Sequence, residues 1–363
     1  MSVNFIGMIG HRHYSEIHPP EGPVIDIDYI DRFARAHEAG GFDRILIGYF
    51  SEAPDGFLIA ARAAFVTQQL GLMLAHRTGF MAPTLAARKL ATLDQLSGGR
   101  AAVHIISGGD DADQRRDGDY LGHDERYART DEYLDILKKI WSSQKPVSHH
   151  GKYYGFEQAY AEVKPLQETQ IPIYFGGSSE AAICVAGKHA DIFALWGETH
   201  DQVRETIARV RAAAAQHGRT VRFSLSLRPI LAATEPAAWA RAERILAETK
   251  RLRGAAMLGD PASQPQNVGS QRLLEAASRG TVLDKRLWTA MAAATGAKGN
   301  TTALVGTPEQ VADALLDYYD LGVTTFLIRG FDPLEDAVQY GRELIPLVRD
   351  EVARRDAART AAE

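Results

Sequence analysis

The sequence predicts an α/β protein folded as one (β/α)8 barrel, that is, a TIM barrel with insertions. Short apolar runs alternate eight times with longer segments of helical periodicity, a pattern typical of parallel strands joined by helical crossovers. Eight such units favour a closed barrel over an open doubly wound sheet. The 363 residues are 45% hydrophobic and 24% charged, an ordinary globular composition in a chain long enough to bury a large core.

Four of the predicted strands come in the N-terminal part of the chain. They are expected at residues 5–9, 44–48, 70–76 and 101–107, with helices after them at 26–39, 55–69, 84–96 and 127–141. In the first of these helices Ile27, Ile30 and Phe33 fall on one face, and the glycines at positions 40 and 41 end it.

The same alternation continues to the C-terminus. Strands are expected at residues 171–177, 191–197, 222–232 and 325–330, and helices at 179–189, 202–217, 235–252, 308–321 and 334–353. Residues 1–363 are therefore predicted to form a single barrel domain.

Two stretches interrupt this rhythm. Residues 142–170 are too long for a tight connection and contain alternating aromatic residues, which indicates a small hairpin or an excursion between barrel units. Residues 253–301 mix Gly, Pro, Gln and Asn with two short helical patterns, at 271–277 and 284–294. Long insertions of this kind are often lids or binding loops, so a mobile lid is expected at 253–301.

Charge and cysteine content narrow the function. Lys and Arg number 41 and Asp and Glu 46, which gives a formal charge of −5 and argues against a dedicated nucleic-acid binder. The only cysteine, Cys184, excludes an internal disulfide and fits a reducing compartment. We see no signal-peptide pattern at the N-terminus and no apolar run of 18 residues. The expectation is a cytoplasmic enzyme for a small molecule, with no nucleic-acid or membrane partner.

The most informative strand end is the segment YFGGSSEAA, in which a strand runs into two glycines, two serines and a helix. Glycine lets the backbone approach an anion closely, and bare helix N–H groups with hydroxyl donors make a phosphate site. Ser178 or Ser179 is equally suited to simple N-capping of that helix. Tyr127, at the start of another predicted helix, is a donor to the same phosphate or a tyrosine at the edge of the core.

Other polar positions point less clearly to chemistry. The loop SGGDDADQRRDG is either a ligand-binding loop or a solvated turn. His11, His13 and His76 lie at strand ends but lack an acidic third ligand at metal-binding spacing, so no metal is expected. Cys184 is read as a packing residue. The sequence has no G-x-S-x-G, P-loop or dinucleotide fingerprint.

Several segments together resemble a known family: APTLAARKLATLDQLSGGR, IPIYFGGSSEAA, DIFALWGE, ALVGTPEQVADAL and FLIRGFDPLEDA. The chain resembles the bacterial luciferase-like flavin monooxygenase superfamily and, within it, the reduced-FMN-dependent alkanesulfonate monooxygenases. The resemblance implies a (β/α)8 barrel that receives reduced FMN from a separate NAD(P)H-dependent flavin reductase. It also implies oxidation of a small substrate by oxygen, which in the sulfonate enzymes breaks the C–S bond and releases sulfite and an aldehyde. Homodimers and homotetramers are common in such families.

The resemblance also implies a cofactor site. The phosphate of FMN is expected at Ser178, Ser179 and the amides after Gly177, with help from Tyr127. Ser107 is expected beside the isoalloxazine ring or the ribityl chain. The loop at Ala53 is expected to line the far side of the ring.

The chain departs from the sulfonate enzymes at several positions. Ala53 stands where they carry a cysteine, Ser226 and Arg228 where they carry Arg and His, and Phe331 where they carry Tyr. Arg228 either binds a sulfonate through its two terminal nitrogens or pairs with a neighbouring carboxylate. His13 and His76 are candidates for proton transfer or are structural histidines.

These departures leave the substrate open. An organosulfur compound cleaved as sulfonates are is the leading interpretation. The alternatives are oxidative cleavage of a nitrogen heterocycle such as a flavin or a pyrimidine, and a non-catalytic flavin-binding relative. Two further hypotheses are a deazaflavin-dependent dehydrogenase on the same barrel and an unrelated barrel hydrolase.

Overall fold

The computed structural model describes residues 3–168, 170–254, 265–299 and 301–362. Hydrogen-bonded strands follow the order β9, β13, β1, β2, β3, β4, β7, β8, and β8 pairs again with β9. This closed ring of parallel strands, each followed in the chain by a helix, is the predicted (β/α)8 barrel. The ring consists of β1 (Asn4–Ile9), β2 (Arg44–Ile47), β3 (Gly71–Arg77), β4 (Ala101–Ile106), β7 (Ile173–Gly176), β8 (Ile192–Trp196), β9 (Arg222–Leu231) and β13 (Val323–Ile328).

Helices follow these strands as the periodicity predicts, with ends that differ by a few residues. They are α1 (Ile27–Ala39), α2 (Gly56–Val66), α3 (Pro83–Ser97), α5 (His123–Ser142), α6 (Glu180–His189), α7 (His200–Ala215), α8 (Glu235–Gly254) and α11 (Pro308–Asp320). None of the helices in the described part of the chain combines the length and the apolar character needed to cross a membrane.

By the density of its internal contacts the chain divides into two compact units. The first comprises Met1–Ile45, Ala194–Ala208 and Arg222–Glu363, and the second comprises Leu46–Phe193 and Arg209–Val221.

In the first unit, register decides which side chains of β1, β13 and β9 share a face. Leu327 lies opposite Ile6 on one side and Ser226 on the other. Because side chains alternate along a strand, Arg329 and Arg228, each two residues further on, point to the same face as this row. Phe5 and Phe326 face the other way, with ring centroids 5.9 Å apart.

The C-terminal helical segment differs from the prediction of one helix at 334–353. It consists of α12 (Pro333–Gln339), a π-helical turn (Tyr340–Leu344) and α13 (Ile345–Ala362). The Tyr340 hydroxyl donates to the carbonyl of Pro229 at 2.5 Å, and Gly341 lies against Gly40 so closely that a Cβ atom would stand 2.3 Å from its Cα. These contacts hold the π-helical turn against the end of β9 and the end of α1.

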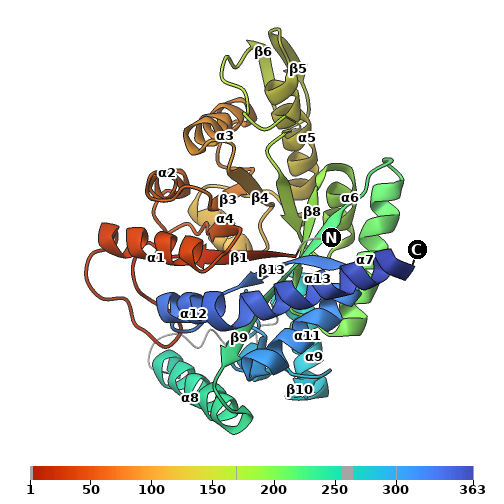
Figure 1. Cartoon of the computed structure of the whole chain (residues 1–363). Coiled ribbons are helices and arrows are strands. Elements are labelled where there is room, and N and C mark those ends of the chain that lie inside the picture. Colours follow the sequence, from red (N-terminus) through yellow and green to blue (C-terminus); the bar gives the residue numbers. More distant parts are fainter. Residues whose placement is uncertain (1–2, 169, 255–264, 300, 363) are drawn as a thin grey trace. The chain divides into compact units, whose positions relative to one another are not determined.

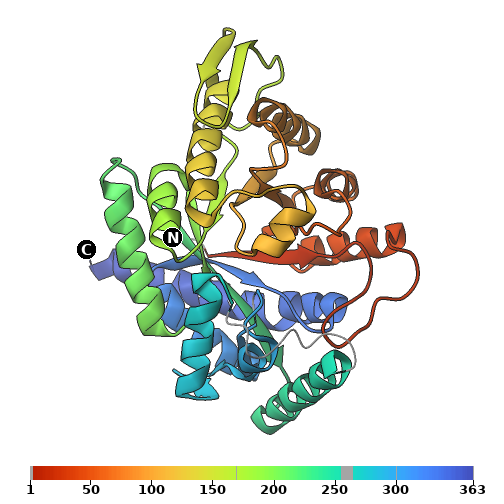
Figure 2. The same cartoon turned by 180° about the vertical axis from the view of Figure 1, so that it is seen from behind.

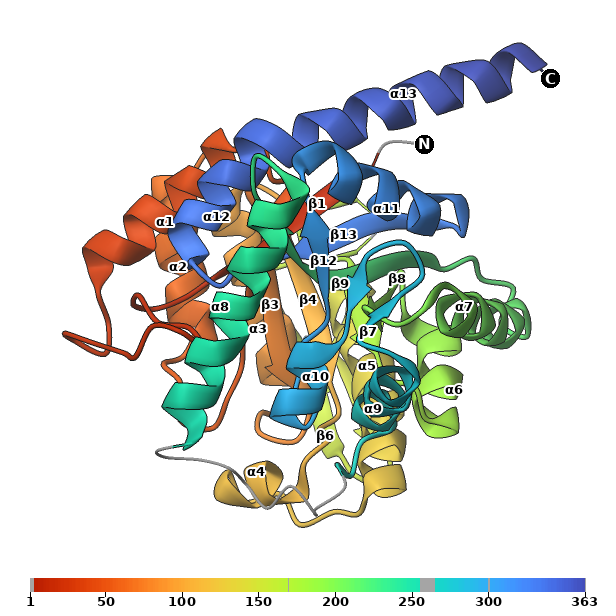
Figure 3. The same cartoon turned by 90° about the horizontal axis from the view of Figure 1, so that it is seen from below.

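The insertion at 253–301 lies partly outside the described residues, because it includes 255–264 and 300. Its role as a lid therefore stays a prediction. The described part contains α9 (Val268–Arg279), β10 (Val282–Leu283), β11 (Leu287–Trp288) and α10 (Ala290–Thr295), and it leads into β12 (Ala303–Gly306), as Figure 3 shows.

The prediction of a helix at 284–294 is wrong in its first half, where the chain forms β11. The sequence analysis also did not predict β12. Leu287 and Trp288 pair with β12 in an antiparallel ladder, and β12 pairs in turn with the end of β9. Trp288 is fully buried with Met291 and Val305. Burial of this large side chain outweighs the local helical pattern, which only α10 follows.

The second unit contains β3, β4 and β7 with their helices. Residues 142–170 contain an antiparallel hairpin of β5 (Val147–His150) and β6 (Gly155–Ala159), one of the two forms expected there. The hairpin lies at the C-terminal end of α5 (Figures 1 and 2). Asp94, fully buried in α3, accepts hydrogen bonds from the backbone N–H of Leu166 at 2.7 Å and from the Gln167 side chain at 2.7 Å, which ties the returning segment to the barrel.

Candidate functional site

The turn from β7 into α6 is built around a glycine. Gly177 has φ +139°, and a Cβ atom there would lie 2.7 Å from the Cβ of Ala182 and 2.9 Å from the hydroxyl oxygen of Tyr127. Both distances are shorter than real contacts allow. The close approach of Ala182 and Tyr127, together with the positive φ, therefore requires glycine at this position.

Ser179 caps α6, and its hydroxyl accepts from the N–H of Ala182 at 3.3 Å. It also hydrogen-bonds with Tyr127. Burial raises the pKa of that tyrosine above 10, and the hydrogen bond with Ser179 reduces this rise only in part. Tyr127 therefore keeps its proton at neutral pH. The half-buried Ser178 lies between Gly177 and Ser179 in this turn.

These four residues meet the chemical needs of a phosphate group. A helix N-terminus offers unpaired N–H donors and a favourable dipole. Gly177 allows Tyr127 to come close to the turn, and the hydroxyl groups add further donors. The structure thus brings together all four predicted phosphate residues, namely Tyr127, Gly177, Ser178 and Ser179.

Ser107 is buried at the end of β4, where its hydroxyl lies 2.9 Å from that of Thr130 on α5. Thr130 is also 2.8 Å from the hydroxyl of Thr78, and it donates its own proton to the carbonyl of Arg126 at 2.8 Å. Because Thr130 has one proton, Ser107 must donate to it. The oxygen of Ser107 is then left to accept a hydrogen bond from a ligand donor.

Ala53 lies half-buried in the turn after β2, and its N–H donates to the carbonyl of Phe50 at 3.0 Å. Nearby in the chain, the hydroxyl of Ser51 donates to Asp113 at 2.8 Å. Asp113 belongs to α4 (Asp111–Arg116). This short helix lies within the segment SGGDDADQRRDG, for which the sequence predicts either a ligand-binding loop or a solvated turn. The predicted Ala53 loop is therefore held against α4.

His76 faces the helices. Its Nε2 atom lies 2.6 Å from the hydroxyl of Tyr133 on α5, and its ring contacts Phe57 of α2 edge-on. Burial, with a smaller contribution from the charge of Lys89, lowers the pKa of His76 to about 4. His76 is thus a neutral side chain between β3 and its helices, and it does not join the phosphate residues.

The neighbouring Arg77 points to the opposite face, as strand alternation requires, and it is a candidate site residue that the sequence motifs did not indicate. It is buried, its Nη2 pairs with Asp113, and its guanidinium carbon lies 4.9 Å from the ring centre of Tyr49. Its Nε and Nη1 atoms are buried and have no hydrogen-bond partner among the described residues. Unsatisfied charged donors are costly, so two of them on one buried guanidinium point to a ligand.

His104 is a second missed candidate. It shares a register row with Ala75 and Tyr174, burial lowers its pKa to about 4, and its Nδ1 atom has no partner. A histidine inside the otherwise apolar run AAVHII was the available signal.

In the first unit, Arg228 is fully buried and pairs with Glu16 through both terminal nitrogens. The Nη1–Oε1 distance is 2.6 Å and the Nη2–Oε2 distance is 2.9 Å. Arg329 contacts the same carboxylate, with Nη2 2.9 Å from Oε1. Burial alone would raise the pKa of Glu16, but the two arginines hold it well below its usual range. Arg228 was expected either to bind a sulfonate or to pair with a neighbouring carboxylate. In the structure it pairs with the carboxylate of Glu16.

These residues line a cavity of about 530 Å³ at the carboxyl ends of β1 and β13, the end of the strands at which barrels of this class carry their sites. Four arginines and one carboxylate give it a positive lining, while Tyr14, Pro19 and Pro20 make part of the wall apolar. The arginines are Arg12, Arg228, Arg253 and Arg329.

His13 does not line this cavity. Its ring lies between His18, at 4.8 Å, and Tyr29, at 5.8 Å between ring centroids. Its proposed part in proton transfer stays a prediction.

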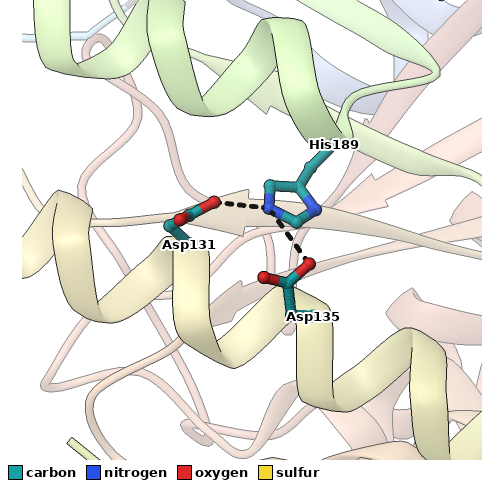
Figure 4. Close-up of side chains that lie close together, drawn as sticks. All are labelled: Asp131, Asp135 and His189. Atoms are coloured by element: carbon teal, nitrogen blue, oxygen red, sulfur yellow. Dashed lines mark hydrogen bonds and ion pairs between the residues drawn. The ribbon is translucent and has the colours of Figure 1, made fainter. Parts of the chain in front are cut away.

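One group of acidic and histidine side chains in the described residues has metal-like spacing: Asp131 and Asp135 on α5 and His189 at the end of α6 (Figure 4). The ammonium group of Lys188 lies 2.9 Å from Asp131 and 2.8 Å from Asp135. The hydrogen bond from His189, together with Lys188, lowers the pKa of Asp131 to about 2. This group is a set of ion pairs that joins α5 to α6, the two helices that carry Tyr127 and Ser179.

The model of the luciferase-like monooxygenase family matches residues 3–325 of the chain. Among solved structures, riboflavin lyase is similar with a TM-score of 0.79 and 19% identity over 97% of this chain and 92% of that chain. EDTA monooxygenase from Chelativorans sp. BNC1 has a TM-score of 0.77 and 20% identity, over 97% and 94% of the two chains. DmoA from Hyphomicrobium sulfonivorans has a TM-score of 0.76 and 23% identity, over 96% and 88%. At these identities the structural likeness concerns the fold.

Proposed function

The chain belongs to the luciferase-like monooxygenase family, and from this we propose that it is a monooxygenase that uses reduced FMN and oxygen to oxidise a small organic molecule. A separate NAD(P)H-dependent flavin reductase would supply the reduced FMN. The observation that carries the proposal is the turn at Gly177, where the hydroxyl groups of Tyr127 and Ser179 meet at the N-terminus of α6.

The residues of the second unit fit FMN. Ser178, Ser179, Tyr127 and the amides after Gly177 would hold the phosphate, and Ser107 would accept from a ribityl hydroxyl or from the ring. The Ala53 loop would line the ring, and the partnerless nitrogens of Arg77 would donate to its polar edge. Reduced FMN, when bound, supplies the electrons that activate oxygen, and the chain provides placement and a site shielded from water.

For the substrate we favour an organosulfur compound whose C–S bond is cleaved. The positive lining of the cavity in the first unit suits an oxygen-bearing sulfur group, and its apolar wall suits a carbon chain. For an alkanesulfonate the overall reaction consumes one oxygen molecule and one reduced FMN. It releases an aldehyde, sulfite, water, a proton and oxidised FMN; one oxygen atom ends in the aldehyde and the other in water.

One observation favours a second candidate. Arg228, the residue best suited to bind a sulfonate, already holds Glu16 with both terminal nitrogens. A substrate without a compact anion, such as a nitrogen heterocycle of the flavin or pyrimidine kind, would leave this pair undisturbed.

The test is sulfite release by the chain with FMN, a flavin reductase, NADH and oxygen, over short and long alkanesulfonates. Sulfite that depends on the chain supports C–S cleavage. No sulfite but substrate-dependent oxidation of a sulfone, flavin or pyrimidine supports the second candidate. Binding of reduced FMN without any turnover would indicate a non-catalytic relative, and reduction of a deazaflavin without oxygen would overturn the monooxygenase proposal. A Gly177→Ala variant, which should not bind FMN, is the control for reductase background.

A further inference from the structure

Glu16 pairs with both terminal nitrogens of Arg228, one of the four arginines that line the cavity. A guanidinium binds an oxyanion best through two parallel N–H···O bonds, and Arg228 gives both of its terminal nitrogens to the carboxylate of Glu16 at 2.6 and 2.9 Å. Nη2 of Arg228 also donates to the carbonyl of Gly330 at 2.9 Å. No terminal N–H pair of Arg228 is left for a second anion.

Arg228 cannot turn easily to present another edge. Its guanidinium carbon lies 3.5 Å from the ring centre of Phe331, so the group lies flat on an aromatic face, and the side chain is 1% exposed. Packing and hydrogen bonding thus fix the plane in which any ligand of Arg228 must lie, and Glu16 already occupies it.

The loop that carries Glu16 is fastened on both sides of that residue. The hydroxyl of Ser15 donates to the carbonyl of Phe331 at 2.6 Å, and the ring of His18 lies 2.6 Å from Asp332. Both partners follow β13, the strand that ends beside Arg329. The Glu16 carboxylate is therefore held in place by its backbone as well as by its charge.

Arg329 is the cation with donors to spare. Among the described residues it touches Glu16 through Nη2 at 2.9 Å, while its Nη1 meets only the sulfur of Met8 at 3.8 Å, a weak acceptor. A ligand in this cavity can reach Arg329 by a single contact without displacing Glu16.

We propose that Glu16 determines the specificity of this cavity: it acts as an internal carboxylate that withholds Arg228 from substrates, so that the cavity disfavours compact oxyanions and accepts groups that need one contact with Arg329. The inference rests on the proposed function only in taking this cavity as the substrate pocket. It names a residue that neither the motifs nor the departures from the sulfonate enzymes pointed to.

The test is equilibrium binding of ethanesulfonate to the full-length chain, measured by calorimetry with and without oxidised FMN. Glu16→Gln should tighten binding at least tenfold, because the amide offers Arg228 only one acceptor oxygen and no longer neutralises its charge. The double variant Glu16→Gln with Arg228→Met should return to the wild-type affinity. Asp201→Asn, which removes an exposed carboxylate that pairs with Arg204 on α7 and not with Arg228, should leave the affinity unchanged.

Two results would overturn the proposal: a folded Glu16→Gln protein that binds ethanesulfonate no more tightly than wild type, or a gain that survives in the double variant. Should Glu16→Gln fail to fold, Glu16→Asp keeps the charge but shortens the reach, and an unchanged affinity in that variant would count against the proposal equally. The binding measurement needs neither reductase nor oxygen. It therefore tests the role of Glu16 even if the protein turns out not to be a monooxygenase.

Discussion

The hydroxyl oxygen of Tyr127 lies 2.9 Å from the position that a Cβ atom would take at Gly177. The two residues are 50 positions apart in the sequence, on α5 and after β7, and Ser179 hydrogen-bonds with the same tyrosine. The relationship explains why the turn needs glycine and why a tyrosine accompanies it. The same relationship suggests two substitutions that test the phosphate site, one that adds a methyl group and one that removes a hydroxyl group.

Gly177→Ala should abolish detectable FMN binding or weaken it at least tenfold. The added methyl group would overlap Ala182 and the hydroxyl of Tyr127, so it would displace the start of α6 and the tyrosine proposed to hold the phosphate. Fluorescence titration of FMN measures the loss. Gly218→Ala is the matched control: that glycine also has positive φ, +63°, but nothing lies within 4 Å of its Cβ position. Equal loss in both variants would mean that backbone strain, and not the site, is responsible.

Tyr127→Phe should weaken FMN binding by roughly 3- to 10-fold, which corresponds to the loss of one hydrogen bond of about 1 kcal/mol. Tyr133→Phe removes a hydroxyl from the same helix, one that contacts His76 instead. It should leave the FMN affinity unchanged and lower only the stability. If the two variants bind FMN alike, Tyr127 does not contact the phosphate.

Arg77→Met should weaken binding of reduced FMN more than binding of oxidised FMN. Reduced FMN readily carries a negative charge on its ring, and Arg77 is a buried cation with two partnerless nitrogens. Anaerobic and aerobic titrations give the two affinities, and we expect them to fall by different factors, with the reduced form losing at least tenfold. Arg116→Met, which removes an exposed arginine from α4, is the control. An equal loss for both redox forms would assign Arg77 a packing role.

The protein should lose stability as the pH falls from about 6.5 towards 4. Burial is the main cause that lowers the pKa of His37, His76 and His104 to about 4 from 6.5. The unfolded chain therefore binds protons in this window and the folded chain does not, so stability is complete above pH 6.5 and decreases below it. At pH 5 each histidine should cost about 2 kcal/mol.

Thermal unfolding from pH 7.5 to 5 measures this dependence. His76→Gln keeps a polar partner for Tyr133 and should make the fall in Tm shallower than in wild type, whereas His217→Gln, outside the buried set, should not. An identical pH profile for His76→Gln and wild type would show that His76 titrates normally in the folded protein.

The eight strand–helix units and the glycine–serine turn were determined by the sequence alone, because both depend on local properties. Apolar periodicity distinguishes strands from helices within a short window, and a strand that runs into Gly177 and Ser179 needs no distant residue to be recognised. Short elements such as β11 and β12 could not be predicted in this way, because burial of Trp288 against Val305 decides them.

Only the tertiary structure decided which candidates lie together. All seven residues of β3 are buried, as is usual for parallel strands covered on both faces. Nothing local therefore says whether His76 or Arg77 points towards the helices. Glu16 and Arg228 are 212 positions apart, and a long loop after β1 sets the place of Glu16. An ion pair of this kind exists only once β1, β9 and β13 lie side by side, because its energy depends on a distance that the folded chain alone establishes.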